Sequence, residues 1–191
     1  MTDVEQANRK SELLDQLTRQ SDWIKNCDAK ASIAIGGLGI FLAAISSEFI
    51  LIKMGNVISQ AILNLNFSNL LYLSVLAINI VSLFYGVHCL IRVIVPRLSK
   101  ELKKGKGLYT DSLFFFEKIA GNEYADYEVK VNTREEAEKL KDLTSQVYIN
   151  AKICTVKHQW FSKGIKWTMW SIGGLILLFF IGALLLEVGG I

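Results

Sequence analysis

Three long apolar stretches dominate the pattern of hydrophobic and polar positions along the chain. Residues 54–91 and 167–186 contain no formally charged side chain, and residues 31–52 contain only Glu48. A helix rises about 1.5 Å per residue, so about 20 residues cross the ~30 Å hydrocarbon core of a bilayer. The pattern predicts an all-α integral membrane protein with transmembrane helices at residues 31–52, 70–91 and 167–186.

Long helices are also predicted next to these spans. Residues 1–30 lack Gly and Pro and carry a broken apolar stripe, which indicates a helix that runs straight into the first span. Between residues 133 and 166, apolar residues recur every three or four positions, which is typical of one face of a helix. Thr133 followed by Glu136 has the spacing of a capping box, so this helix is expected to begin at residue 133.

These two helices both lead toward the membrane and are expected to run side by side as a helical cytoplasmic stem. Counting back from the inner ends of the first and third spans places Leu17 opposite Ile153. The remaining residues divide into an external loop at 53–69, an inter-span segment at 92–132 and an external tail at 187–191.

The distribution of Lys and Arg predicts the orientation of the spans. Residues 1–30 carry five of these residues and residues 92–166 carry fifteen, whereas residues 53–69 carry one and the chain after Lys166 carries none. Basic residues accumulate on the cytoplasmic side of membrane proteins. The amino terminus is therefore predicted to be cytoplasmic and the carboxyl terminus external.

Composition agrees with a membrane protein and excludes several other classes. Hydrophobic residues make up 51% of the chain and charged residues 20%, which excludes a disordered protein, a collagen-like repeat and a disulfide scaffold. The length of the apolar runs excludes an ordinary soluble enzyme. The formal net charge of +3 is small and spread along the chain, so it does not favour nucleic-acid binding.

The sequence contains no recognised catalytic motif. Cys154 and His158 have the spacing of metal ligands on one helix face, but Cys27, His88 and Cys89 are predicted to lie at other depths. We therefore expect no catalytic site, no metal site and no cofactor.

Charged residues at the inner ends of the spans are candidates for a gate. Lys30 and Arg92 have the positions of interfacial anchors, whose long side chains reach the headgroup region. Asp28 does not serve the positive-inside pattern and is expected to pair with a basic residue at the same height. A salt-bridged ring there would hold the spans in a closed arrangement.

Small residues in the first span predict close helix packing. Ser32 and Gly36 form one small-xxx-small pair, and Gly39 and Ala43 form another. The partner helix is either the second or third span of the same chain or a neighbouring subunit.

Three segments, in order along the chain, resemble the Pycsar effector transmembrane proteins of bacterial antiphage defence. They are residues 21–32, which lead into the first span, residues 112–124, which contain three consecutive phenylalanines, and residues 142–157. The phenylalanines either pack the stem against the inner leaflet or form a wall on which a base stacks.

This resemblance implies a signal-gated membrane effector. A partner cyclase is expected to make a cyclic pyrimidine mononucleotide, either cyclic UMP or cyclic CMP, which the effector binds in the cytoplasm. The effector, expected to be a homo-oligomer in the bacterial inner membrane, then impairs that membrane and causes growth arrest or abortive infection. A constitutive membrane scaffold with a helical stem and an effector of cyclic oligonucleotides are the two alternatives.

The ligand implied by the resemblance has one phosphate charge and one base. Phosphates favour Arg and Lys, and bases stack on aromatic rings. The candidate ligand-binding residues come from the inter-span segment and the long helix, and they are Tyr109, Phe115, Lys118, Lys152 and Lys157.

Overall fold

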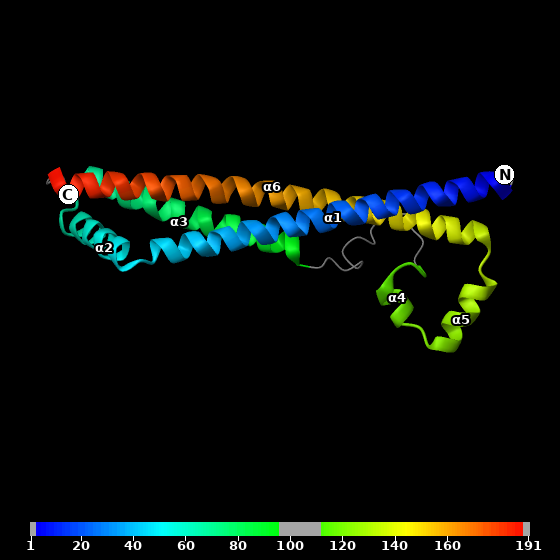
Figure 1. Ribbon diagram of the computed structural model, residues 1–191. Helices are drawn as coiled ribbons and strands as arrows, with labels where there is room; N and C mark the ends of the chain where they lie inside the picture. Colours follow the sequence, from blue (N-terminus) through cyan, green and yellow to red (C-terminus); the bar gives the residue numbers. More distant parts are fainter. Residues whose placement is uncertain (1–2, 96–111, 189–191) are drawn as a thin grey trace. The chain divides into compact units, whose positions relative to one another are not determined.

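The computed structural model describes residues 3–95 and 112–188, and within these ranges the chain is almost entirely helical, with no strand. The helices in chain order are α1 (Asp3–Ile45), α2 (Glu48–Leu63), α3 (Phe67–Ile94), α4 (Phe116–Ala120), α5 (Tyr124–Thr133) and α6 (Glu136–Val188), as labelled in Figure 1. The predicted all-α fold is confirmed.

Two compact units make up the fold. Met1–Cys27 and Pro96–Lys157 contribute to the first, which we call the polar unit. Asp28–Val95 and His158–Ile191 contribute to the second, which we call the membrane unit. Helices α1 and α6 each pass from the polar unit into the membrane unit.

Three helices are long and apolar enough to cross a membrane, as the hydropathy pattern predicts. They are found at Val4–Ile45, Phe67–Ile94 and Glu136–Val188. Their placement in a bilayer stays a prediction, but the number of candidate spans among the described residues agrees with the sequence analysis.

The end of the first apolar helix differs from the expected one. Helix α1 ends at Ile45 rather than at residue 52, because the chain turns at two serines. The Ser46 hydroxyl donates to the carbonyl oxygen of Leu42 at 2.8 Å, and Ser47 adopts an extended backbone conformation before α2 begins. Hydropathy alone does not distinguish one 22-residue helix from two helices that meet at such a corner.

Most of the expected external loop at residues 53–69 is also helical, since α2 continues to Leu63. A short polar corner then leads into α3. The Asn66 side chain accepts a hydrogen bond from the Asn69 backbone N–H at 2.8 Å, and Asn69 Nδ2 donates to the Asn64 carbonyl oxygen at 2.8 Å. These bonds satisfy groups that a helix terminus would otherwise leave unpaired.

The core of the membrane unit joins α1, α2, α3 and α6. Val57, Tyr72, Leu76 and Leu178 form one buried cluster, and the Tyr72 hydroxyl donates to the Leu178 carbonyl oxygen at 3.1 Å. A second buried cluster, which α6 also contacts, consists of Leu38, Leu83 and Leu90. The membrane unit is therefore held together by interhelical packing along the apolar faces.

Glycines allow α3 and α6 to approach each other closely. A Cβ atom added at Gly86 would lie 2.8 Å from the backbone nitrogen of Thr168, and one added at Gly164 would lie 2.8 Å from Leu90 Cγ. Gly36, Gly37 and Gly39 of α1, by contrast, have no such atom within 4 Å. The small face of α1 is therefore not used for packing within the described part of this chain.

The start of the long helix also differs from the expected one. Thr133 is the last residue of α5, and its hydroxyl donates to the Val129 carbonyl oxygen of the same helix at 2.8 Å. Helix α6 begins at Glu136. The predicted capping box is wrong because the Thr133 hydroxyl bonds back into the preceding helix rather than forward.

Candidate functional site

A buried ion pair lies in the polar unit at the start of α6. Asp142 is completely buried, and its Oδ2 atom accepts a hydrogen bond from Arg134 Nη1 at 3.0 Å. The Arg134 side chain, between α5 and α6, is only 6% exposed. A buried charge that loses its partner is strongly destabilising. The pair therefore stabilises the turn between α5 and α6.

The chain just before α4 is tied to the same face of α6. The Leu113 backbone N–H donates to Asp142 Oδ2 at 2.9 Å, and Gln146 Nε2 donates to Ser112 Oγ at 2.9 Å. Asp142 and Gln146 are one helical turn apart and therefore point to the same side. We call Ser112, Leu113, Arg134, Asp142 and Gln146 the Asp142 cluster.

Two buried oxygen atoms of the polar unit have no hydrogen-bond donor within the described part of the chain. They are Asp142 Oδ1 and Gln20 Oε1. Most buried polar atoms in proteins have a partner, so each exception needs an explanation. Carboxylate and amide oxygens only accept hydrogen bonds, so the partner that each atom lacks is an N–H or O–H donor.

An ion pair indicates the register of α1 and α6 in the polar unit. Lys10 Nζ lies 3.7 Å from Glu136 Oε2, and both helices run from the polar unit toward the membrane unit. Equal rise along the two helices places Gln20 level with Gln146. The same register places Leu17 level with residue 143.

The expected pairing of Leu17 with Ile153 is therefore displaced by ten residues, or about 15 Å along the helix. That expectation assumed that the first and third spans begin at the same height, whereas the Lys10–Glu136 contact indicates that α1 and α6 are offset along their axes. In this register Leu143, which is 1% exposed, lies closer to the level of Leu17 than Ile153 does.

Cysteine crosslinking tests this register. With the native Cys27, Cys89 and Cys154 replaced by Ala, the pair Leu17→Cys and Leu143→Cys is expected to form a disulfide under mild oxidation. The matched pair Leu17→Cys and Ile153→Cys is expected to stay reduced, because the two side chains would lie about 15 Å apart along the helices. Disulfide formation in the second pair alone would restore the register counted from the spans.

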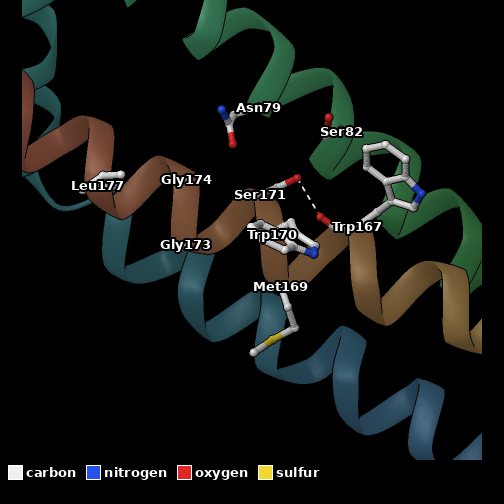
Figure 2. Close-up of a pocket in the computed structure, with 9 residues that line it drawn as sticks. All are labelled: Asn79, Ser82, Trp167, Met169, Trp170, Ser171, Gly173, Gly174 and Leu177. Atoms are coloured by element: carbon white, nitrogen blue, oxygen red, sulfur yellow. Dashed lines mark hydrogen bonds between the residues drawn. The ribbon is translucent and has the colours of Figure 1, made fainter.

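A second candidate site is a groove of about 520 Å³ between α3 and α6 in the membrane unit (Figure 2). Its polar side chains bond mainly to their own helices, since Asn79 Nδ2 donates to the Val75 carbonyl oxygen and Ser171 Oγ donates to that of Trp167. The lining residues are Asn79, Ser82, Trp167, Met169, Trp170, Ser171, Gly173, Gly174 and Leu177. The groove offers no charged side chain, so it suits apolar contacts better than a nucleotide.

Comparison with known proteins decides the family. The model of the Pycsar effector protein domain matches residues 12–186. The chain belongs to the Pycsar effector family. This effector is 27% identical over 178 residues to the Pycsar effector protein GmPycTM of Gulbenkiania mobilis, and the match covers 88% of this chain and 90% of that protein. No solved structure matches the effector.

The family match confirms the resemblance, and it covers α1 from residue 12 through most of α6. It includes all three of the segments on which the resemblance rests. Two of those segments, residues 112–124 and 142–157, are joined in the structure by the hydrogen bonds of the Asp142 cluster. In the polar unit of this Pycsar effector, two of the segments that resemble the family therefore contact each other.

Part of the predicted ligand-binding set lies close to this cluster in the chain. Phe115 precedes α4, and its ring centroid lies 5.0 Å from that of Phe116. Lys118 is half-buried on α4, and its carbonyl oxygen accepts a hydrogen bond from Asn122. Tyr109 lies outside the described residues. Phe115 and Lys118 therefore lie shortly after Leu113 in the chain, and the backbone N–H of Leu113 donates to Asp142.

The other two predicted residues lie farther along α6 of the effector. Lys152 is exposed, with its Nζ atom 5.6 Å from the ring centroid of Tyr148, whereas Lys157 is only 4% exposed. They follow Gln146 by six and eleven residues, which is about 9 and 16 Å along the helix. The predicted set therefore falls into two groups, and ligand binding by either group stays a prediction.

The boundary charges occupy different surroundings. Asp28 is half-buried and Lys30 is exposed. The Arg92 guanidinium carbon lies 5.4 Å from the ring centroid of Trp160, which is within the range of a cation–π contact. The salt-bridged ring of Asp28, Lys30 and Arg92 stays a prediction.

Four residues of the polar unit were not predicted from the sequence to be site residues, namely Gln20, Arg134, Asp142 and Gln146. Helical periodicity assigns Asp142 to the face of α6 opposite Leu140, which suggests exposure to solvent. In the structure, the segment that begins at Ser112 covers this face. Asp142 and Gln146 could have been found from the sequence because both lie in residues 142–157, one of the segments that resemble the family.

Proposed function

We propose that this Pycsar effector binds a cyclic pyrimidine mononucleotide, cyclic UMP or cyclic CMP, in its polar unit and then impairs the bacterial inner membrane. Membership of the family supports a role in antiphage defence and a cyclic nucleotide signal from a partner cyclase. The observation that carries the proposal is the buried Asp142 cluster, which lies in the same unit as the two donor-deficient oxygens, Asp142 Oδ1 and Gln20 Oε1. We propose no catalytic step for the effector.

The polar unit is proposed to face the cytoplasm, where a cyclase would release its product. Twenty of the 21 Lys and Arg residues lie in residues 1–30 and 92–166, which belong largely to this unit. By the positive-inside rule, the amino terminus would be cytoplasmic and the carboxyl terminus external.

Candidate contacts for the nucleotide differ between its parts. The cyclic phosphate is proposed to interact with Lys118, Lys152 or Lys157, and the base with the ring of Phe115, while Tyr109 stays a further candidate. Such a ligand drives a conformational change only by the difference between its affinities for the two states. Asp28, Lys30 and Arg92 are proposed to hold the resting state of the membrane unit.

We propose that the active effector is a homo-oligomer. Glycines at interfaces between membrane helices allow two backbones to come close together. Leaving aside the adjoining residues and backbone of α1, no described atom would lie within 4 Å of a Cβ added at Gly36, Gly37 or Gly39, and a second copy is proposed to pack there.

Binding by the purified full-length effector in detergent micelles tests the proposed ligand. Calorimetry with cyclic UMP, cyclic CMP, cyclic AMP and a cyclic dinucleotide is expected to show heat only with a cyclic pyrimidine mononucleotide. Lys118→Ala is expected to weaken binding, because a charge-assisted contact with the phosphate is lost. Lys141→Ala, an exposed lysine on α6, is the matched control and is expected to bind like the wild type.

A growth assay gives the cellular outcome. Expression with a pyrimidine cyclase is expected to arrest growth and permeabilise the inner membrane, whereas expression without any cyclase is expected to be harmless. Toxicity without a cyclase, unchanged by Lys118→Ala, would contradict the proposal and favour a constitutive scaffold. Binding of the cyclic dinucleotide alone would favour an effector of cyclic oligonucleotides.

A further inference from the structure

The two donor-deficient oxygens of the polar unit identify the kind of group that completes the site. Asp142 Oδ1 is on a fully buried side chain whose other oxygen already accepts from Arg134 and from the Leu113 backbone. Gln20 Oε1 is buried on α1 and has no donor among the described residues. A buried acceptor without a donor is unfavourable, so both atoms favour a ligand that supplies N–H or O–H groups.

Gln20 and Asp142 lie within about 6 Å of each other along the helix axes, a separation that one small ligand can cover. The Lys10–Glu136 pair places Gln20 level with Gln146, which is one helical turn beyond Asp142 on α6. The four residues from Asp142 to Gln146 correspond to about 6 Å along the helix. A cyclic mononucleotide carries two kinds of uncharged donor, one on the base and one on the ribose, and they are also several ångströms apart.

Neighbouring side chains indicate which donor meets which acceptor. The segment bonded to Asp142 continues into Phe114, Phe115 and Phe116, which can stack against a base. Carboxylates accept hydrogen bonds from the exocyclic amine of cytosine, and the N3–H of uracil is a donor at the adjacent position of the ring. The base therefore belongs beside Asp142, which leaves the ribose for Gln20.

We propose that Asp142 Oδ1 accepts a hydrogen bond from the pyrimidine N–H edge and that Gln20 Oε1 accepts one from the ribose 2′-hydroxyl. This assignment rests on the proposed function, since it takes the ligand to be a cyclic pyrimidine mononucleotide. It adds that Asp142 determines base specificity and that Gln20 distinguishes a ribose from a deoxyribose.

Two substitutions test this role, and the ligand analogues below separate it from a structural one, because Asp142→Asn also leaves the buried Arg134 without a carboxylate. Asp142→Asn keeps an oxygen for Arg134 and Leu113 but places an NH₂ donor where Oδ1 was. This NH₂ group would face the N–H donor of the base, and two donors cannot form a hydrogen bond. Gln20→Met keeps the size of the side chain and removes a buried acceptor that has no donor among the described residues. Because that acceptor is unfavourable in the free protein, Gln20→Met is expected to unfold at the wild-type temperature or slightly above it.

Calorimetry on the full-length effector in micelles measures the effect on binding. For whichever of cyclic UMP and cyclic CMP binds, Asp142→Asn is expected to reduce affinity at least ~10-fold, and Gln20→Met roughly 3- to 10-fold. Gln16→Met lies one turn earlier on α1, where Gln16 bonds to exposed Glu12, and is expected to bind like the wild type.

Ligand analogues then test each contact. The 2′-deoxy analogue is expected to bind the wild type roughly 3- to 10-fold more weakly but to bind Gln20→Met as well as the ribose form does. An analogue whose base is methylated at its donor (N3-methyl for uracil, N4,N4-dimethyl for cytosine) is expected to bind the wild type at least ~10-fold more weakly.

The outcomes distinguish this inference from the function on which it rests. Wild-type affinity in both Gln20→Met and Asp142→Asn, or tight binding of the methylated base, would overturn the assignment while leaving nucleotide sensing intact. Absence of binding of every cyclic pyrimidine mononucleotide to the wild type would overturn the proposed function itself, and the assignment with it.

Discussion

Arg134→Ala is expected to lower the free energy of unfolding of the polar unit by about 3–5 kcal/mol. The substitution leaves Asp142, which is fully buried, without the guanidinium that lies 3.0 Å from its Oδ2 atom. Denaturant titration in micelles measures the effect through the fluorescence of Trp23 after Trp160, Trp167 and Trp170 are replaced by Phe. Trp23 is then the single tryptophan of the chain and reports on the polar unit.

Two controls show whether burial of the pair causes this loss. Lys139→Ala breaks a 2.9 Å ion pair with Glu136 in which both side chains are exposed, so it is expected to cost at most about 1 kcal/mol. The double variant Arg134→Met, Asp142→Leu removes both buried charges and is expected to regain much of the lost stability. Equal effects of Arg134→Ala and Lys139→Ala would mean that the Asp142 cluster is not a buried core of the polar unit.

Gly86→Ala is expected to destabilise the membrane unit by about 1–3 kcal/mol, because the added methyl group overpacks the contact between α3 and α6. The new Cβ would lie 2.5 Å from Thr168 Oγ1 and 2.8 Å from the Thr168 backbone nitrogen. A backbone atom cannot move aside as a flexible side chain can, so the two helices must separate. Unfolding of the purified protein by increasing fractions of sodium dodecyl sulfate measures the change.

Gly37→Ala, measured without nucleotide so that the proposed active oligomer is not expected, is the matched control in the membrane unit. A Cβ atom at this position of α1 would have no such neighbour within 4 Å, so only the helix propensity changes. Alanine is favoured over glycine in helices by up to about 1 kcal/mol, and the variant is therefore expected to be as stable as the wild type or more so. A loss at Gly37 as large as that at Gly86 would indicate that α1 packs closely against another helix in the micelle.

Much of the architecture could be predicted without coordinates. Runs such as residues 54–91 lack charge over a length greater than a bilayer requires, and a helix is the structure that satisfies its backbone within one such segment. The three candidate spans and the all-α fold follow from that one-dimensional pattern. The ordered segments at residues 21–32, 112–124 and 142–157 likewise indicated the family that the comparison then showed.

Helix boundaries were less predictable. The corner at Ser46 and Ser47 divides an apolar run into α1 and α2, and the hydroxyl of Ser46 stabilises the end of α1. Thr133 was expected to begin α6 but ends α5 instead. Serine and threonine hydroxyls bond to backbone groups on either side of a helix end, so their presence marks a boundary without showing which helix they belong to.

The sequence by itself therefore determined the class of this protein, its candidate spans and its family, because hydropathy and motif order are properties of the chain alone. Tertiary structure decided the candidate site. Asp142 is on the face of α6 that periodicity predicts to be polar, and it is buried because a segment about 30 residues earlier donates to it. The level of Gln20 relative to Gln146 was also decided there, because the register of two helices depends on contacts such as Lys10–Glu136 between residues far apart in the chain.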